Sequence, residues 1–195
     1  MLWFFIVLVA YMLGSVPSGV ILTKILGYGD LRRVGSGNIG ATNVMRVGGL
    51  RIAGLVWILD MLKAMLAVWL GAHFGGVVAG AWCGFAAIVG HCFPVWLRFR
   101  GGKGVSCLFG IMLAINPVIF VFCGIEWLVV ALGLGKSSAG AIVVFGVLPI
   151  LGFVMNNGVG WAFLAMSVLC LWRHVDNLRR LARGAESSIE WRWKK

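Results

Sequence analysis

The sequence has 195 residues, of which 61% are hydrophobic and 12% are charged, and its net charge is +11. Soluble globular proteins contain roughly 45–50% apolar and about 25% charged residues, so a soluble domain is excluded. Intrinsic disorder requires low hydrophobicity and is excluded by the same composition. A basic chain can bind nucleic acid, but the apolar excess indicates that this positive charge belongs to a multi-pass membrane protein.

The apolar segments predict an all-α, polytopic membrane protein with a single domain over residues 1–195. A helix needs about 20 mostly apolar residues to cross the hydrocarbon core of a bilayer. Pro17 should kink the first span or mark a polar widening, and Asn116-Pro117 should divide the apolar stretch after Val105, because proline removes a helix donor. About seven spans are predicted, over residues 2–23, 52–72, 77–97, 105–115, 117–135, 139–155 and 159–173, followed by a tail over 174–195.

The basic residues are distributed unevenly among the connections between these spans. Alternate connections and the tail hold all of the 17 lysines and arginines except Lys63, whereas the connections near Gly75, Asn116 and Asn156 hold none. This asymmetry is the positive-inside pattern. It predicts an N-terminus outside and a C-terminus in the cytoplasm, which requires an odd number of spans.

Few polar residues lie within the predicted spans. Asp60 and Lys63 are three residues apart on one helical face and can pair, and Glu126 lies mid-span without a local partner. Charges in spans are candidate functional sites, but a structural role remains open for all three. The five cysteines have neither disulfide nor metal-site spacing, so we expect buried packing residues and no metal.

Three helix starts on the predicted cytoplasmic side combine small residues, hydroxyl or amide side chains, and a cation. They are residues 35–43 with Arg46, residues 98–104 with Lys103, and Lys136-Ser137-Ser138. The free N–H groups and the positive dipole end of a helix N-terminus bind anions, and glycine lets the amides approach closely. If they converge on one face, these starts should bind phosphate or a phosphate ester.

Two familiar phosphate motifs do not apply. Gly35, Gly37 and Gly40 match the dinucleotide fingerprint, but that fingerprint requires a strand in a βαβ unit. The run before Val105 is not a P-loop, because Gly104 stands where Ser or Thr is required.

No protein base is evident in these loops. The sequence has no His–Asp pair at the spacing of soluble acyltransferases, no Gly-x-Ser-x-Gly elbow and no acidic pair. His91 and His174 lie at the depth of the loops and are candidate functional residues. His73 lies at the outer end of its span and is expected to be interfacial.

Several motifs resemble one family. They are Gly-Ser-x-x-x-Gly from Gly14, the run from Gly35 to Arg46, residues 90–95 leading to residues 101–105, and the tail run from Arg173 with Gly184 and Glu186. With them the chain resembles, over nearly its whole length, the bacterial membrane glycerol-3-phosphate acyltransferases that use acyl phosphate. It departs from that pattern at Lys136-Ser137-Ser138, where family members often have an Arg-Tyr-Val-Ser run.

The resemblance implies acyl transfer from acyl phosphate to the first hydroxyl of glycerol 3-phosphate, giving lysophosphatidic acid and phosphate in the first step of phospholipid synthesis. It implies seven spans in the bacterial inner membrane, an active site at the cytoplasmic face, and no cofactor. The expected partners are the two substrates and the lipid bilayer, not nucleic acid. Functional links are expected to the enzyme that makes acyl phosphate and to the next acyltransferase.

We predict four catalytic residues, which are Ser36, His91, Lys103 and Asn177. The predicted substrate- and phosphate-binding residues are Gly35, Gly37, Asn38, Thr42, Asn43, Arg46, Gly101, Gly102, Gly104, Ser137 and His174. Lys103 and the amides of residues 101–104 should hold one phosphate, and the Ser36–Arg46 loop should help to hold that of the acyl donor. The departing phosphate can take the proton of the alcohol, so that proximity and electrostatic stabilisation suffice.

The alternative is a multi-pass transporter of an organic or phosphate anion. Transporter sites usually lie near the midplane on broken helices of paired repeats. Here the polar motifs gather at one face and no inverted repeat is visible, although Glu126 and Pro17 keep the alternative open.

Overall fold

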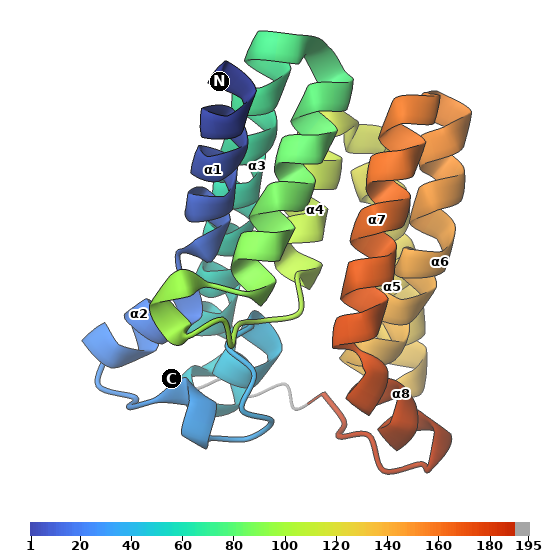
Figure 1. Cartoon of the computed structure of the whole chain (residues 1–195). Coiled ribbons are helices and arrows are strands. Elements are labelled where there is room, and N and C mark those ends of the chain that lie inside the picture. The colour runs from blue at the N-terminus through green and yellow to red at the C-terminus, as the bar shows by residue number, and fades with distance from the viewer. Residues whose placement is uncertain (190–195) are drawn as a thin grey trace.

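The structure, a computed structural model, describes residues 1–189 and is all-helical over that range (Figure 1). Its elements are α1 (Leu2–Ser15), α2 (Ser18–Ile25), η1 (Leu31–Arg33), α3 (Ala41–Cys92), η2 (Val95–Leu97), α4 (Val105–Ile115), α5 (Pro117–Leu134), α6 (Ser137–Met155), α7 (Asn157–Arg173) and α8 (Val175–Ala182). Arg192, Lys194 and Lys195 of the predicted basic tail lie outside the described residues.

The first predicted span is a broken helix. Pro17 has φ −87° and ψ 70°, outside the helical region, and separates α1 from α2. The predicted kink is therefore confirmed. The span is longer than predicted, because α2 continues to Ile25 instead of ending at residue 23.

Helix α3 contains the second and third predicted spans, but both limits differ from the prediction. It begins at Ala41 rather than at residue 52, with a break at Gly49 (φ 77°, ψ −178°). At Gly75 and Gly76 the backbone is again non-helical, and the chain turns back on itself at the top of Figure 1. The helix ends at Cys92 rather than at residue 97, because Pro94 restricts the residue before it to non-helical conformations.

The later helix boundaries follow from asparagine caps and from proline. The limits of α4 agree with the predicted 105–115, and Asn116 Oδ1 accepts a hydrogen bond from Val118 N at 2.9 Å at the start of α5. Asn156 caps α7 in the same way, through Gly158 N at 2.8 Å. Because an Asn side chain satisfies free N–H groups, it fixes where a helix begins. Helix α7 accordingly begins at Asn157, two residues before its predicted start at 159. Helix α6 also begins two residues early, at Ser137 instead of 139, but Lys136 at its N-cap makes no side-chain capping bond.

Four helical segments among the described residues are long and apolar enough to cross a membrane, and α7 with α8 makes a fifth if that bent pair is one span. They are Leu2–Ile25, Ala41–Leu97, Pro117–Leu134 and Ser137–Met155. Length and composition therefore support a polytopic membrane protein, whereas the count of seven remains a prediction.

Small residues allow the helices to approach closely. A Cβ on Gly90 would collide with Tyr11 O, and one on Gly14 would collide with the backbone of Ala87, so glycine brings α1 against α3. All five cysteines are buried and free, as predicted. Helix α2, the 93–104 loop and α8 lie at one end of the molecule, opposite the N-terminus (Figure 1). The helix starts with phosphate-binding character gather at this same end.

Candidate active site

A cavity of about 580 Å³ opens among the three helix starts. Its lining includes most of the predicted site residues, which are Ser36, Asn38, Thr42, Asn43, Arg46, His91, Lys103, Gly104, Ser137, His174 and Asn177. Gly35, Gly37, Gly101 and Gly102 are not among the lining residues. Thr42 Oγ1 lies 3.3 Å from Ser137 Oγ, so the start of α3 meets the start of α6. The predicted convergence of the three starts is present in the structure.

Asn43 organises the loop before α3, residues 34–40, here called the first loop. It is 1% exposed, and its Oδ1 accepts a hydrogen bond from Ser36 N at 3.1 Å. Its Nδ2 donates to the carbonyls of Leu31, Val34 and Asn38 at 2.9–3.2 Å. These bonds show that Asn43 shapes the loop around Ser36 and Asn38. Asn43 also lines the cavity, and its binding of substrate stays a prediction.

Two glycines of the same loop adopt backbone conformations that the turn requires. Gly35 (φ 59°) and Gly37 (φ 70°) adopt left-handed conformations that other residues rarely enter. A Cβ on Gly35 would also collide with Asn43 Oδ1. Both glycines therefore shape the loop and do not contact the cavity.

The loop before α4, residues 98–104, here called the second loop, differs from the prediction. Gly101 N donates to Cys92 O and Gly102 N donates to His91 O, each at 3.0 Å. These two amides are occupied and cannot hold phosphate as predicted. Arg173 donates to the carbonyls of Gly101 and Gly102, each at 3.1 Å, and so fixes the loop on its other side. The loop then directs Lys103 into the cavity.

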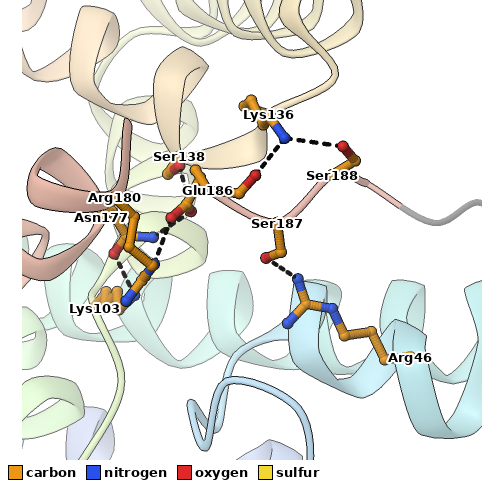
Figure 2. Close-up of polar contacts among 9 residues, drawn as sticks. All are labelled: Arg46, Lys103, Lys136, Ser138, Asn177, Arg180, Glu186, Ser187 and Ser188. Atoms are coloured by element: carbon orange, nitrogen blue, oxygen red, sulfur yellow. Dashed lines mark hydrogen bonds and ion pairs between the residues drawn. The ribbon is translucent and has the colours of Figure 1, made fainter. Parts of the chain in front are cut away.

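A polar network surrounds Lys103 (Figure 2). Lys103 Nζ donates to Asn177 Oδ1 at 2.5 Å, and Asn177 Nδ2 donates to Glu186 Oε1 at 2.6 Å. Glu186 also accepts from Ser138 Oγ and from Arg180 Nε, each at 2.7 Å. Burial, with the nearby charge of Arg180, lowers the pKa of Lys103 to about 8. Lys103 is thus a cation whose charge can change in the mildly alkaline range.

Residues 184–189, here called the tail strap, cross the mouth of the cavity. Arg46 donates to Ser187 Oγ at 2.6 Å, and Lys136 donates to Ser188 Oγ at 2.9 Å and to Glu186 O (Figure 2). The site prediction omitted several lining residues, namely Ser106, Ser138, Arg180, Glu186, Ser187 and Ser188. Arg180 and Glu186 belong to the tail motif, so a signal for these two was present in the sequence.

The three histidines lie at the two depths in the membrane that the sequence predicts. His91 (4% exposed) and His174 (3% exposed) both line the cavity. His174 Nδ1 lies 2.7 Å from Cys170 O and, because a carbonyl only accepts, must donate to it. His73 is not among the lining residues and stacks on Trp69 with ring centroids 5.7 Å apart.

The inner part of the cavity is apolar. Its walls include Trp57 of α3, Phe109 of α4, and Phe120 and Ile125 of α5, and Phe109 meets Phe120 edge to face with centroids 6.1 Å apart. A cationic mouth joined to an apolar interior suits a molecule with an anionic head and an apolar chain. Fold and site together are those of a helical membrane protein with a cavity suited to a phosphate-bearing lipid.

Comparison with known proteins identifies the family. The family model of glycerol-3-phosphate acyltransferase matches residues 4–184. The chain is 43% identical to the glycerol-3-phosphate acyltransferase of Rhizobium etli over 182 residues, covering 93% of this chain and 88% of the relative. It is 45% identical to that of Burkholderia vietnamiensis over 187 residues, with the same coverage. The chain belongs to the glycerol-3-phosphate acyltransferase family and is an acyltransferase of phospholipid biosynthesis.

Solved structures agree with this assignment. The crystal structure of PlsY (YgiH), an integral membrane glycerol 3-phosphate acyltransferase, in its glycerol 3-phosphate form has a TM-score of 0.92 at 33% identity, covering 97% of this chain and 96% of that one. Its lysophosphatidic acid form has a TM-score of 0.90 at 31% identity, covering 98% and 97%. The predicted all-helical, membrane-embedded fold is therefore confirmed.

Proposed function

We propose that the protein transfers a fatty acyl group from acyl phosphate to the 1-hydroxyl of glycerol 3-phosphate, giving lysophosphatidic acid and phosphate. The observation that carries this proposal is the cavity, whose cationic mouth continues into an apolar interior. The solved relatives named for their glycerol 3-phosphate and lysophosphatidic acid forms support these two molecules as substrate and product.

The mouth offers two sets of phosphate ligands. On one side Lys103 stands before the N-terminus of α4, whose dipole and free N–H groups favour an anion. On the other side the cavity is lined by Ser36 of the first loop and by Thr42 and Arg46 of α3. Thr42 there contacts Ser137 of α6. Two sets suit a reaction in which one phosphate belongs to the donor and one to the acceptor.

The reaction needs no protein base. The 1-hydroxyl oxygen attacks the acyl carbonyl carbon, the bond from that carbon to the phosphate oxygen breaks, and the hydroxyl proton passes to the departing phosphate. The lining residues support this route, since Glu186 already accepts hydrogen bonds from Ser138, Asn177 and Arg180. The ring of His174 bonds a backbone carbonyl, not a carboxylate that would make it a stronger base. Lys103 and Arg46 stabilise the negative charge that develops.

We further propose seven membrane crossings in the bacterial inner membrane, with the N-terminus outside and the C-terminus in the cytoplasm. The reversal at Gly75 and Gly76 supports two crossings within α3. Helices α1 with α2, α4, α5, α6 and α7 supply the other five. With the site at the cytoplasmic face, the protein would receive acyl phosphate from the enzyme that makes it and pass its product to the next acyltransferase.

Cysteine labelling tests this topology. A cysteine at exposed Val77 should react with a membrane-impermeant maleimide in intact cells, and one at exposed Arg183 should react only after the membrane is opened. Labelling of both positions from the same side would contradict the orientation.

A donor comparison tests the reaction. The purified protein receives labelled glycerol 3-phosphate with acyl phosphate, acyl-coenzyme A or acyl carrier protein thioester of one chain length. We expect lysophosphatidic acid from acyl phosphate only, without any membrane gradient. Product from a thioester at an equal or higher rate would overturn the proposed donor, and anion flux into vesicles without product would favour the transporter.

A further inference from the structure

A buried ion pair lies against His91, a residue of the cavity wall. Lys63 Nζ lies 2.7 Å from Asp60 Oδ1, and the two residues are 7% and 1% exposed. Their predicted pairing is therefore confirmed. Removing two charges from water is costly, and such a pair is weak evidence for stability alone. Its contact with His91 indicates a function.

The hydrogen bonds of Lys63 determine the tautomer of His91. An ammonium group has three N–H donors and no acceptor. Lys63 Nζ donates to Val16 O at 2.7 Å, lies 3.1 Å from His91 Nδ1, and forms an ion pair with Asp60 Oδ1 at 2.7 Å. His91 Nδ1 must therefore accept, so the neutral ring carries its proton on Nε2.

The protonated nitrogen of His91 lies at the loop that carries Lys103. A Cβ on Gly102 would collide with His91 Nε2, so only glycine leaves room for this edge of the ring. His91 lines the cavity, and among residues 1–189 its Nε2 has no hydrogen-bonding partner. An N–H donor in the wall of an anion-binding cavity is suited to a phosphate oxygen.

We propose that Lys63 is a positioning residue, with Asp60 as its counter-charge, that holds His91 in the Nε2–H tautomer so that it donates to a phosphate oxygen of the substrate. This inference rests on the proposed phosphate binding in the cavity. Asp60, His91 and Cys107 have ligand atoms within 4.8 Å of one another, which is metal-site geometry. The Lys63 ammonium already contacts two of these groups, so the protein supplies the cation itself.

Nitrogen NMR of protein labelled with ¹⁵N in its histidine rings reads the tautomer directly. The signals are assigned by their loss in His91→Gln and His174→Gln. In the wild type we expect an unprotonated Nδ1 and a protonated Nε2 on His91. A protonated Nδ1 would overturn the proposal. The NMR readout does not depend on turnover. A wrong tautomer can therefore be distinguished from failure of the proposed reaction, because in the latter case the wild type itself would make no product.

Two variants separate positioning from stability. Lys63→Met leaves Asp60 as an uncompensated buried charge and is expected to lower Tm. The double variant Asp60→Asn/Lys63→Met removes both charges. It should recover Tm but still lose about 10–100-fold in kcat/KM, as with other orienting partners of histidine. The double variant Asp176→Asn/Arg179→Met removes an exposed pair of the same spacing and should keep full activity.

A double-mutant cycle completes the test. In the His91→Gln background, the change of Asp60 and Lys63 should cause no further loss of kcat/KM, because the group they position is gone. Losses that multiply, or a folded Asp60→Asn/Lys63→Met protein with wild-type kcat/KM, would show that the pair is purely structural.

Discussion

At the scale of single residues, Lys103 couples the chemistry of the site to pH. Burial lowers its pKa to about 8. The ammonium is therefore present below pH 8 and is lost as the pH rises through 8. The pH dependence of kcat/KM reports the pKa values of the free enzyme. Therefore kcat/KM should fall with alkaline pH as this charge disappears.

Substitution by arginine tests this pH dependence. A guanidinium stays charged at all accessible pH values. Lys103→Arg should flatten the alkaline limb of kcat/KM for glycerol 3-phosphate, even if its absolute activity is lower because the fork geometry differs. An alkaline limb of unchanged position in this variant would assign the titration to another group.

Removal of the Lys103 charge should cost far more than removal of an exposed cation. Loss of one preorganised donor at a reacting anion typically reduces kcat by about 10²–10³-fold, and we expect a loss of this order for Lys103→Met. Lys24→Met, at an exposed position of α2, is the matched control and should be near wild type in steady-state kinetics. Equal, small effects of the two substitutions would remove Lys103 from the site.

At the scale of elements, Gly104 sets the turn into α4. Its φ is 84°, and a Cβ there would lie 2.9 Å from Cys170 Sγ. Gly135 has a similar φ of 66° but no atom within 4 Å of its added Cβ. Gly104→Ala should therefore lower Tm more than Gly135→Ala, whose cost is limited to the left-handed strain of about 1–2 kcal/mol. Equal shifts in thermal unfolding would show that crowding against α7 is unimportant.

Helix limits were predictable where local chemistry sets them. Asn116-Pro117 ends α4 and starts α5, because the Asn side chain caps and the proline cannot continue a helix. The start of α3 was not predictable from hydropathy. Its first turns carry Asn43, Arg46 and Arg51, and the apolar signal begins only beyond them.

The candidate site was predictable only in part, for a related reason. Motifs identified its polar side chains, since short glycine-rich runs before helices have a recognisable chemistry. Which residues of a motif shape the loop and which line the cavity depends on long-range contacts. Examples are Gly102 N with His91 O and Arg46 with Ser187. No local pattern reports these contacts, so the part that Asn43 plays in shaping the loop could not be predicted.

At the scale of the whole molecule, Glu186 joins distant parts of the chain. It bonds Ser138 of α6 and Asn177 and Arg180 of α8, and it holds the tail strap at the cavity. Burial alone would raise its pKa, but the hydrogen bonds from Ser138, Arg180 and Asn177 outweigh burial and lower it. A lowered carboxyl pKa gives stability above the unfolded value, and this stability is lost as the pH falls through the folded value.

Glu186→Gln should therefore lower Tm at neutral pH and reduce the loss of Tm on acidification. The Tm of the variant and that of the wild type should converge as the pH falls below the ordinary pKa range of a glutamate side chain. Asp176→Asn, at an exposed carboxylate in the first turn of α8, controls for general charge effects. Parallel Tm curves for Glu186→Gln and wild type would contradict the role assigned to this carboxylate.

We propose that one cavity brings acyl phosphate and glycerol 3-phosphate together so that the departing phosphate accepts the proton. Phosphorus NMR of the purified protein with both substrates follows every phosphate at once. We expect lysophosphatidic acid and inorganic phosphate to appear in equal amounts, with no signal change when glycerol 3-phosphate is omitted. Consumption of acyl phosphate without lysophosphatidic acid, or no reaction with both substrates present, would contradict it.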